Sequence, residues 1–208
     1  MNTNFLIGIC GNARSGKDTF CEYAKMFLSK KKVAAARAAF ADELKKDLDD
    51  LCRHKIGISA FTQDTKEKEI IRPLLVTYGT EVIRKMDENW WINKLEKSLG
   101  VHQHMNILPI ITDVRYPNEL EWIKGKHNGV VIHVTRKGIK PANKEEKANN
   151  SFLRKNADYR IMWPTFGDDG IDQADKFVRR VMNKIYKTKI HEPTRQRTST
   201  IDTESTEH

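Results

Sequence analysis

The 208-residue sequence lacks any long hydrophobic run and has only three cysteines, Cys10, Cys21 and Cys52. No apolar stretch approaches the roughly 20 residues that span a bilayer, and the run at 5–10 is too short for a signal peptide. The cysteines are far apart and form no CxxC pair, which argues against a disulfide scaffold or a zinc cluster. We therefore expect a cytoplasmic protein with no membrane partner, whose thiols are buried and inert.

Acidic residues are scarcer than basic ones, 28 against 37, which gives a formal net charge of +9. The segment 187–208 holds four of each sign, so the excess belongs to residues 1–186, with 33 basic residues against 24 acidic ones. A basic surface suits a phosphorylated small molecule or a nucleic acid. Because no interleaving of aromatic and basic residues and no known DNA-binding motif is present, we do not expect nucleic acid.

Strand and helix patterns alternate along the chain, which predicts an α/β fold with a parallel sheet. Apolar runs predict strands at 5–10, 33–40, 106–112, 130–135 and 159–163. Helical spacing predicts helices at 19–28, 42–52 (with Asp42 as its N-cap), 69–83, 89–99, 117–124 and 172–186. The polar segment 137–156 is expected to be a mobile, lid-like excursion, and the polar tail 187–208 to be disordered. One domain, 1–186, remains.

A glycine-rich motif, Gly11-x-x-x-x-Gly16-Lys17, follows the first predicted strand and opens a helix. In that context the backbone N–H groups of the loop wrap an anion, the helix N-terminus faces it, and the lysine reaches the β- and γ-phosphates of a nucleoside triphosphate. The alternative is a glycine-rich turn with a surface lysine, and the flanking strand and helix argue against it.

The residue after the lysine is Asp18, where a serine or threonine hydroxyl usually binds Mg²⁺. A carboxylate is also a hard oxygen ligand, so one hypothesis is that Asp18 binds the ion directly or through water. The other is that Asp18 faces the acceptor as a base while Thr19 contacts a phosphate. The sequence leaves both open.

A second group of polar residues, Thr112-Asp113-Val114-Arg115, ends a buried strand. The carboxyl ends of parallel strands form the ligand-binding edge of an open α/β sheet. We expect Asp113 to hold Mg²⁺ or its waters there, and Arg115 to fork onto a phosphate. The alternative is that Asp113 caps the next helix and Arg115 forms a surface ion pair.

Four segments together resemble the phage-type deoxynucleoside monophosphate kinases of the P-loop nucleotide kinase group. They are Arg14–Thr19, Ala41–Lys45, the region of Arg72, Gly79-Thr80-Glu81 and Trp90-Trp91, and Thr112–Arg115 with Glu119 followed by Val131–Arg136. The resemblance spans most of residues 5–136 and thins beyond them to Ala157–Ile161. It implies a three-layer fold like that of nucleoside monophosphate kinases, with a parallel sheet flanked by helices and a mobile lid.

The implied activity is transfer of the ATP γ-phosphoryl group to a deoxynucleoside 5′-monophosphate, with Mg²⁺. The resemblance assigns ATP binding to the loop residues Asn12, Ala13, Arg14, Ser15, Gly16, Lys17, Asp18 and Thr19. It assigns the acceptor site to Leu44, Lys45, Arg72, Gly79, Thr80, Trp91, Asp113, Arg115 and Glu119. Lys17, Arg115 and Arg136 would neutralise charge during transfer, while Asp18 and Asp113 are the candidate metal ligands.

Some alternatives stay open at this point. Trp91 either contacts a base or packs as a core tryptophan on a helix face. Pro73 stands where a second basic residue of the acceptor site is expected, and the lid segment lacks the family's motif. The nearest rival function is a P-loop kinase of another metabolite, of the dephospho-coenzyme A or phosphomevalonate type. More distant ones are a nucleotide-dependent DNA-binding factor and a catalytically silent nucleotide-binding regulator.

The oligomeric state, with a homodimer among the options, and the accepted base are not fixed by the sequence. If the chain is a phage protein, the expected cytoplasm is that of its host.

Overall fold

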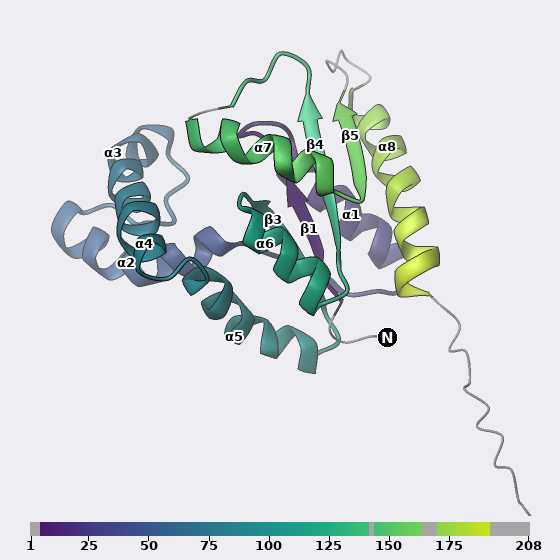
Figure 1. The fold of residues 1–208 in the computed structure, drawn as a ribbon, viewed down its shortest axis with the longest axis horizontal. Helices are drawn as coiled ribbons and strands as arrows, with labels where there is room; N and C mark the ends of the chain where they lie inside the picture. The colour runs from purple at the N-terminus through teal and green to yellow at the C-terminus, as the bar shows by residue number, and fades with distance from the viewer. Residues whose placement is uncertain (1–4, 142–143, 164–169, 192–208) are drawn as a thin grey trace, which may run out of the picture.

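The computed structural model describes residues 5–141, 144–163 and 170–191. Its centre is a five-stranded sheet in the order β2-β3-β1-β4-β5, in which all neighbours are parallel (Figure 1). The strands are β1 Ile7–Cys10, β2 Ala35–Ala38, β3 Leu108–Val114, β4 Val130–Arg136 and β5 Tyr159–Trp163. The predicted parallel α/β sheet is therefore confirmed. β1 lies between β3 and β4, so the residues that follow those two strands reach the same edge of the sheet as the loop after β1.

The sequence pattern explains the strand bounds. β3 runs two residues past the predicted end, because its side chains are buried up to Thr112 and again at Val114. β2 is shorter than predicted, four residues, and three of them are not buried. Pro109 lies within β3 and pairs in register with Ala36. The predicted β5 matches the structure at both ends.

Helices cover both faces of the sheet. On one face, α1 (Lys17–Lys30) and α8 (Gly170–Ile185) contribute Phe20, Phe27, Leu28, Val178 and Met182 to a core with the strands. On the other face, the core is built from α5 (Trp90–His104), α6 (Pro117–Glu121), its π-helical continuation η2 (Trp122–Lys126) and α7 (Lys144–Asn156). The predicted three-layer arrangement is thus present.

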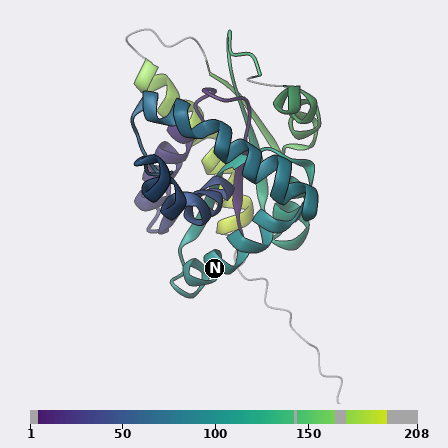
Figure 2. The same cartoon turned by 90° about the vertical axis from the view of Figure 1, so that its left-hand side faces the viewer.

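A group of helices extends from the sheet on the second face (Figures 1 and 2). It consists of α2 (Phe40–Ile56), α3 (Thr65–Val76), the π-helix η1 (Thr77–Ile83) and α4 (Arg84–Met86). Leu48, Cys52 and Ala60 form a small separate core there. We call these four elements the acceptor-side helices, because the acceptor residues of the predicted site fall largely on them. α2 and α3 both extend into the segment 53–68, where no helix was predicted.

Two helix predictions need correction. α2 begins at Phe40 rather than after Asp42, because its first amides are bound by a side chain from β3 described below. The segment at 187–190 was expected to be disordered but forms part of the π-helical turn η3 (Tyr186–Ile190), which packs against the core through Tyr186 and Ile190. The rest of the tail, 192–208, lies outside the described residues.

The expected lid also has regular structure. Lys144–Asn156 forms the helix α7, whose Leu153 is buried against the sheet. Whether α7 moves stays a prediction. Among the described residues, no helix is both long enough and apolar enough to cross a membrane.

Candidate active site

The phosphate loop begins directly after β1 and ends in α1, as the motif predicts. Gly11 and Gly16 have φ of +134° and +93°, values that favour glycine. A Cβ atom on Gly11 would lie 2.1 Å from the carbonyl oxygen of Val134, so the loop packs against β4 too closely for any side chain. The loop conformation therefore depends on glycine at both ends.

Lys17 lies across this loop. Its Nζ donates to the carbonyl oxygens of Gly11, at 2.9 Å, and Asn12, at 2.8 Å. Burial lowers the pKa of Lys17, and the positive charge of Arg115 lowers it further, while Glu146 and other carboxylates oppose this. Two cations therefore act on the same region of the sheet edge, which suits an anionic ligand.

The loop also contains polar atoms without partners. Within the described part of the chain, the buried Oγ of Ser15 and Oδ1 of Asn12 have no hydrogen-bond partner. Such buried groups are normally satisfied, so a ligand at this site accounts for them. Together with the glycine conformations and Lys17, they fit a bound polyphosphate.

A protein carboxylate already lies on the loop. Oε1 of Glu146, from α7, accepts a hydrogen bond from the backbone N–H of Ala13 at 2.8 Å. Asn12 Nδ2 donates to the carbonyl of Ile139 in the segment that leads to α7. A carboxylate is the closest side-chain analogue of a phosphate oxygen pair, so this contact identifies the Ala13 amide as an anion-binding group.

Asp113 is used differently from the first expectation. Its Oδ1 accepts from Phe40 N at 2.9 Å and its Oδ2 from Ala41 N at 2.8 Å, so both oxygens cap the N-terminus of α2. Burial raises the pKa of Asp113, while the Ala41 amide and Arg115 oppose the rise. The sequence analysis kept a cap on the next helix as the alternative; Asp113 does cap a helix, but that helix is α2, which precedes β3 in the chain. A carboxylate engaged in this way is a poor candidate for holding Mg²⁺.

Asp18 is the other proposed metal ligand. Its side chain is 85% exposed at the start of α1 and lies 3.9 Å from Arg37 Nε, which pairs more closely with Asp42. Among the described residues, no cluster of three or more His, Cys, Asp or Glu side chains could hold a metal ion. A metal at this site would therefore take most of its ligands from the phosphates and water, which is usual for Mg²⁺.

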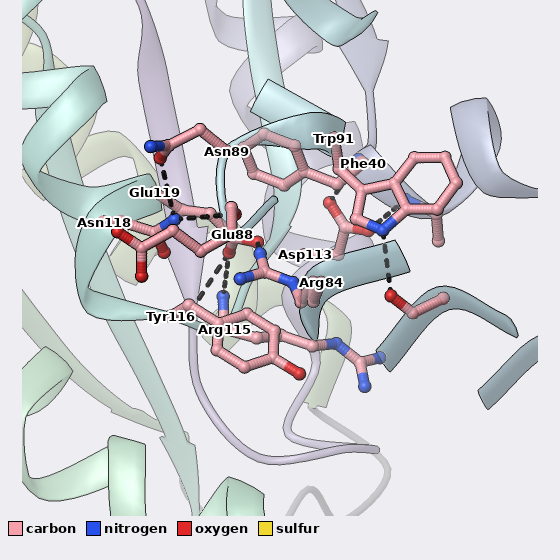
Figure 3. Close-up of polar contacts among 12 residues, drawn as sticks. Phe40, Arg84, Glu88, Asn89, Trp91, Asp113, Arg115, Tyr116, Asn118 and Glu119 are labelled. Carbon is pink, nitrogen blue, oxygen red and sulfur yellow. Dashed lines mark hydrogen bonds and ion pairs between the residues drawn. The ribbon is translucent and has the colours of Figure 1, made fainter. Parts of the chain in front are cut away.

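Glu119 lies at the centre of a buried polar cluster (Figure 3). Its Oε2 accepts from the backbone N–H groups of Arg115, at 2.7 Å, and Tyr116, at 3.1 Å. Its Oε1 pairs with Arg84 from α4, whose guanidinium carbon lies 3.4 Å from the centre of the Tyr116 ring. Burial raises the pKa of Glu119 to about 7, against the opposing effects of Arg84 and the Arg115 amide.

The predicted acceptor residues fall into two groups. Trp91 is 4% exposed and its Nε1 donates to the carbonyl of Gly79 at 3.1 Å, so the indole joins α5 to η1 inside the core. A Cβ on Gly79 would lie 3.0 Å from the Leu44 side chain, so Leu44 would have to shift by a few tenths of an ångström to admit it. Thr80 is half-buried on η1, Lys45 is half-buried with its Nζ 5.5 Å from the Phe61 ring, and Arg72 is exposed on α3.

The remaining predicted residues lie at the carboxyl edge of the sheet. Arg136 is the last residue of β4 and is exposed. Arg14 and Thr19 are exposed on either side of Lys17. The structure thus brings Lys17, Asp113 and Arg115 into one region, keeps Trp91, Leu44 and Gly79 in packing roles, and leaves Arg72 and Arg136 on the surface.

Three residues of the site were not predicted from the sequence as site residues: Arg37, Arg84 and Glu146. Arg37 stands between Ala36 and Ala38 in β2. Its side chain therefore points to the opposite face of the sheet from those of its neighbours, near the carboxyl end of the strand. Arg84 could be read from the sequence only as a helix arginine that either reaches a phosphate or is solvated, and Glu146 gave no signal, because their partners lie 35 and 133 residues away.

With this geometry established, comparison with known proteins gives one family. The model of the phosphomevalonate kinase family matches residues 9–129, which include the phosphate loop, the acceptor-side helices and β3. No curated protein sequence matches the chain.

Several solved structures resemble the chain weakly over most of its length. A dephospho-CoA kinase from Campylobacter jejuni shares 16% identity and covers 87% of this chain and 98% of its own, at a TM-score of 0.47. An APS kinase from Mycobacterium tuberculosis in complex with AMPPNP and APS shares 12%, covers 86% and 97%, and has a TM-score of 0.43. A shikimate kinase from Bacteroides thetaiotaomicron shares 11%, covers 86% and 98%, and has a TM-score of 0.40. Scores this low carry no conclusion about the reaction.

Proposed function

The chain belongs to the phosphomevalonate kinase family, and from that premise we propose that it transfers the γ-phosphoryl group of ATP to the phosphate of a small phosphomonoester, forming a diphosphate. One observation carries the proposal. The glycine-bounded loop with Lys17 has a second cation, Arg115, acting on the same space, and a carboxylate already lies on the amide of Ala13. This is the arrangement needed to hold two anionic groups against their mutual repulsion.

The chemistry of the step suits the residues present. A phosphate monoester has a second pKa near 6, so at neutral pH its attacking oxygen is already deprotonated. That oxygen forms a bond to the γ-phosphorus while the bond to the β-phosphate oxygen breaks, and ADP leaves with the electron pair. No general base is required for such a loose transition state.

The residues have distinct proposed roles. Lys17 follows the charge that moves from the γ- to the β-phosphate, and Arg115 neutralises the transferring group or the acceptor phosphate. Arg136 would approach from the end of β4. Asp18 would hold Mg²⁺ directly or through water, and the ion would supply further neutralisation of the phosphates. Asp113 fixes α2 beside the loop through its backbone hydrogen bonds.

Two candidates exist for the acceptor, phosphomevalonate and a deoxynucleoside monophosphate. The family match supports phosphomevalonate, the rival that the sequence analysis kept, more than a deoxynucleoside monophosphate. Trp91 is buried, so its ring offers no exposed face on which a nucleotide base could stack. The hypothesis of a nucleotide acceptor depended partly on such a contact. The deoxynucleoside monophosphate remains the second candidate because the loop with Asp18 and the Thr112–Arg115 segment resemble that kinase family.

A panel of acceptors tests the proposal directly. ADP formation is measured with ATP, Mg²⁺ and one of mevalonate 5-phosphate, the four common deoxynucleoside monophosphates or dephospho-CoA, alongside mevalonate and thymidine, which lack a phosphate. We expect turnover with a phosphomonoester that is phosphorylated on its phosphate, and a loss of about 100- to 1,000-fold in Lys17→Ala. Turnover with an unphosphorylated alcohol, or with dephospho-CoA alone, would refute a phosphate acceptor.

A further inference from the structure

The buried ion pair between Arg84 and Glu119 links the acceptor-side helices to the end of β3 (Figure 3). We propose that Arg84 is a positioning residue for the phosphate site: it holds Glu119, which in turn holds the backbone from which Arg115 projects. The role of Arg84 in turnover rests on the function proposed above, whereas the contacts of Arg84 with Glu119 and Tyr116 do not depend on that function.

Glu119 divides its two oxygens between two tasks. One oxygen accepts both the Arg115 and Tyr116 amides, and the other faces Arg84. The amides belong to the turn between β3 and α6, where the chain leaves the sheet edge. Glu119 therefore fixes the direction of the backbone at the residue that carries the second cation of the site.

Arg84 is held in place from a second side. Its guanidinium stacks on the ring of Tyr116, with the central carbon 3.4 Å from the ring centroid, while one nitrogen reaches Glu119. A planar fork that both stacks and donates is a property of arginine that lysine lacks. The pair Arg84–Tyr116 thus orients the carboxylate as well as neutralising it.

The burial of this pair favours a positioning role over a stabilising one. The side chain of Arg84 is 10% exposed and that of Glu119 is 2% exposed. Removing two charges from water offsets most of their attraction, so a buried ion pair is weak support for stability by itself. What the pair does provide is a fixed geometry, because every oxygen of Glu119 is directed at a specific donor.

The consequence reaches the phosphate loop through Arg115. Its charge is the second largest cause of the lowered pKa of Lys17, after burial, so the two cations act on the same space. A displacement of about 1 Å at such a group can cost on the order of 100-fold in rate. α4 follows the π-helix η1, which bears Gly79 and Thr80, so Arg84 ties the acceptor-side helices to the turn that carries Arg115.

A double-mutant cycle on two readouts tests the proposal. The variants are Arg84→Gln, Arg84→Lys, Arg115→Ala and the double variant Arg84→Gln with Arg115→Ala. Lys85→Gln is the matched control, because Lys85 lies next to Arg84 on α4 but pairs on the surface with Glu81. The readouts are the affinity for AMPPNP with Mg²⁺ by calorimetry and kcat with the best acceptor, and a thermal melt checks that each variant is folded.

If Arg84 acts through Arg115, Arg84→Gln lowers AMPPNP affinity and kcat by about tenfold, and adds nothing further in the Arg115→Ala background. Arg84→Lys is expected to recover part of the loss, and Lys85→Gln to behave as wild type. An equal loss from Arg84→Gln with and without Arg115, or a lowered melting temperature with unchanged affinity and kcat, would overturn the proposal. So would an Arg115→Ala variant that binds and turns over normally, because Arg84 would then have nothing to position.

The affinity readout keeps this test separate from the proposed function. If no phosphomonoester is turned over but AMPPNP binds, the function proposed above fails, while the cycle in AMPPNP affinity still decides the role of Arg84.

Discussion

At the scale of single residues, the two aspartates near the phosphate loop have opposite surroundings. Asp113 gives both oxygens to the first amides of α2, whereas Asp18 projects into solvent at the start of α1. The first arrangement stabilises a helix N-terminus, and the second leaves a carboxylate available to an ion. From the sequence both were candidate metal ligands, with a base as the alternative for Asp18 and a helix cap as the alternative for Asp113; the structure separates them.

This separation predicts different results for the same substitution. Asp113→Asn is expected to lower the free energy of unfolding by about 1 kcal/mol, the usual cost of damaging a cap, and to leave the Mg²⁺ requirement unchanged. Asp18→Asn is expected to raise the Mg²⁺ concentration needed for half-maximal activity and to leave the free energy of unfolding unchanged. Urea unfolding and Mg²⁺ titration of the activity check both. The reverse pattern would assign the metal to Asp113.

The thiols give a second prediction at this scale. The three cysteines are free and buried, which confirms the expectation from their spacing. Burial raises the pKa of Cys10 to about 12 and that of Cys21 to about 11, so at pH 8 almost no thiolate is present. We expect native protein to show no fast reaction with a disulfide reagent at pH 8, and all three thiols to react in guanidinium. A fast native reaction would show that the core around β1 and α1 opens.

At the scale of elements, helix α7 is docked over the phosphate loop. Leu153 packs in the core, Asn150 bonds His133 on β4 at 2.8 Å, and Glu146 occupies the amide of Ala13. Since a phosphate of ATP would use the same amide, binding of ATP and docking of Glu146 compete for it.

The competition predicts that Glu146→Gln tightens ATP binding. Removal of one negative charge beside Lys17 is expected to lower the dissociation constant for Mg²⁺-ATP by about three- to tenfold, corresponding to about 1 kcal/mol. Glu121→Gln, the same change at an exposed position on α6, is the control and is expected to have no effect. Calorimetry measures both. Weaker binding in Glu146→Gln would instead mean that the carboxylate organises the loop for ATP.

The contact of α7 with β4 includes a buried ionisable group, the imidazole of His133, which bonds Asn150. Burial lowers the pKa of His133 below its ordinary value of 6.5, opposed by the hydrogen bond to Asn150 and assisted by Arg154, Arg160 and Lys17. The unfolded chain therefore binds more protons than the folded one below pH 6.5, so this contribution to stability is present at neutral pH and is lost as the pH falls. We expect the melting temperature to fall more steeply between pH 7 and 5 in the native protein than in His133→Gln. An equally steep fall of the melting temperature in both proteins would contradict the assignment of this pH dependence to His133.

At the scale of the whole molecule, the parts that were predicted from sequence are those that local patterns determine. The phosphate loop, β5 and the parallel sheet follow from short apolar runs and from glycines beside a lysine. The cap on α2, the Glu146 contact and the Arg84–Glu119 pair were not predicted, because they join residues 73, 133 and 35 positions apart. Which of these residues lie close together can be inferred only once the order of the strands in the sheet is known. The bounds of α2 were wrong for the same reason.

We propose that the sheet edge at β1 brings two anionic substrates together, where a phosphoanhydride forms between them. ³¹P NMR of the reaction with the best acceptor tests this most directly. Two new coupled doublets in the diphosphate region, appearing with ADP as the acceptor's monoester signal disappears, are the predicted result. A product that shows only a new monoester singlet would place the phosphoryl group on a hydroxyl, and would contradict the account.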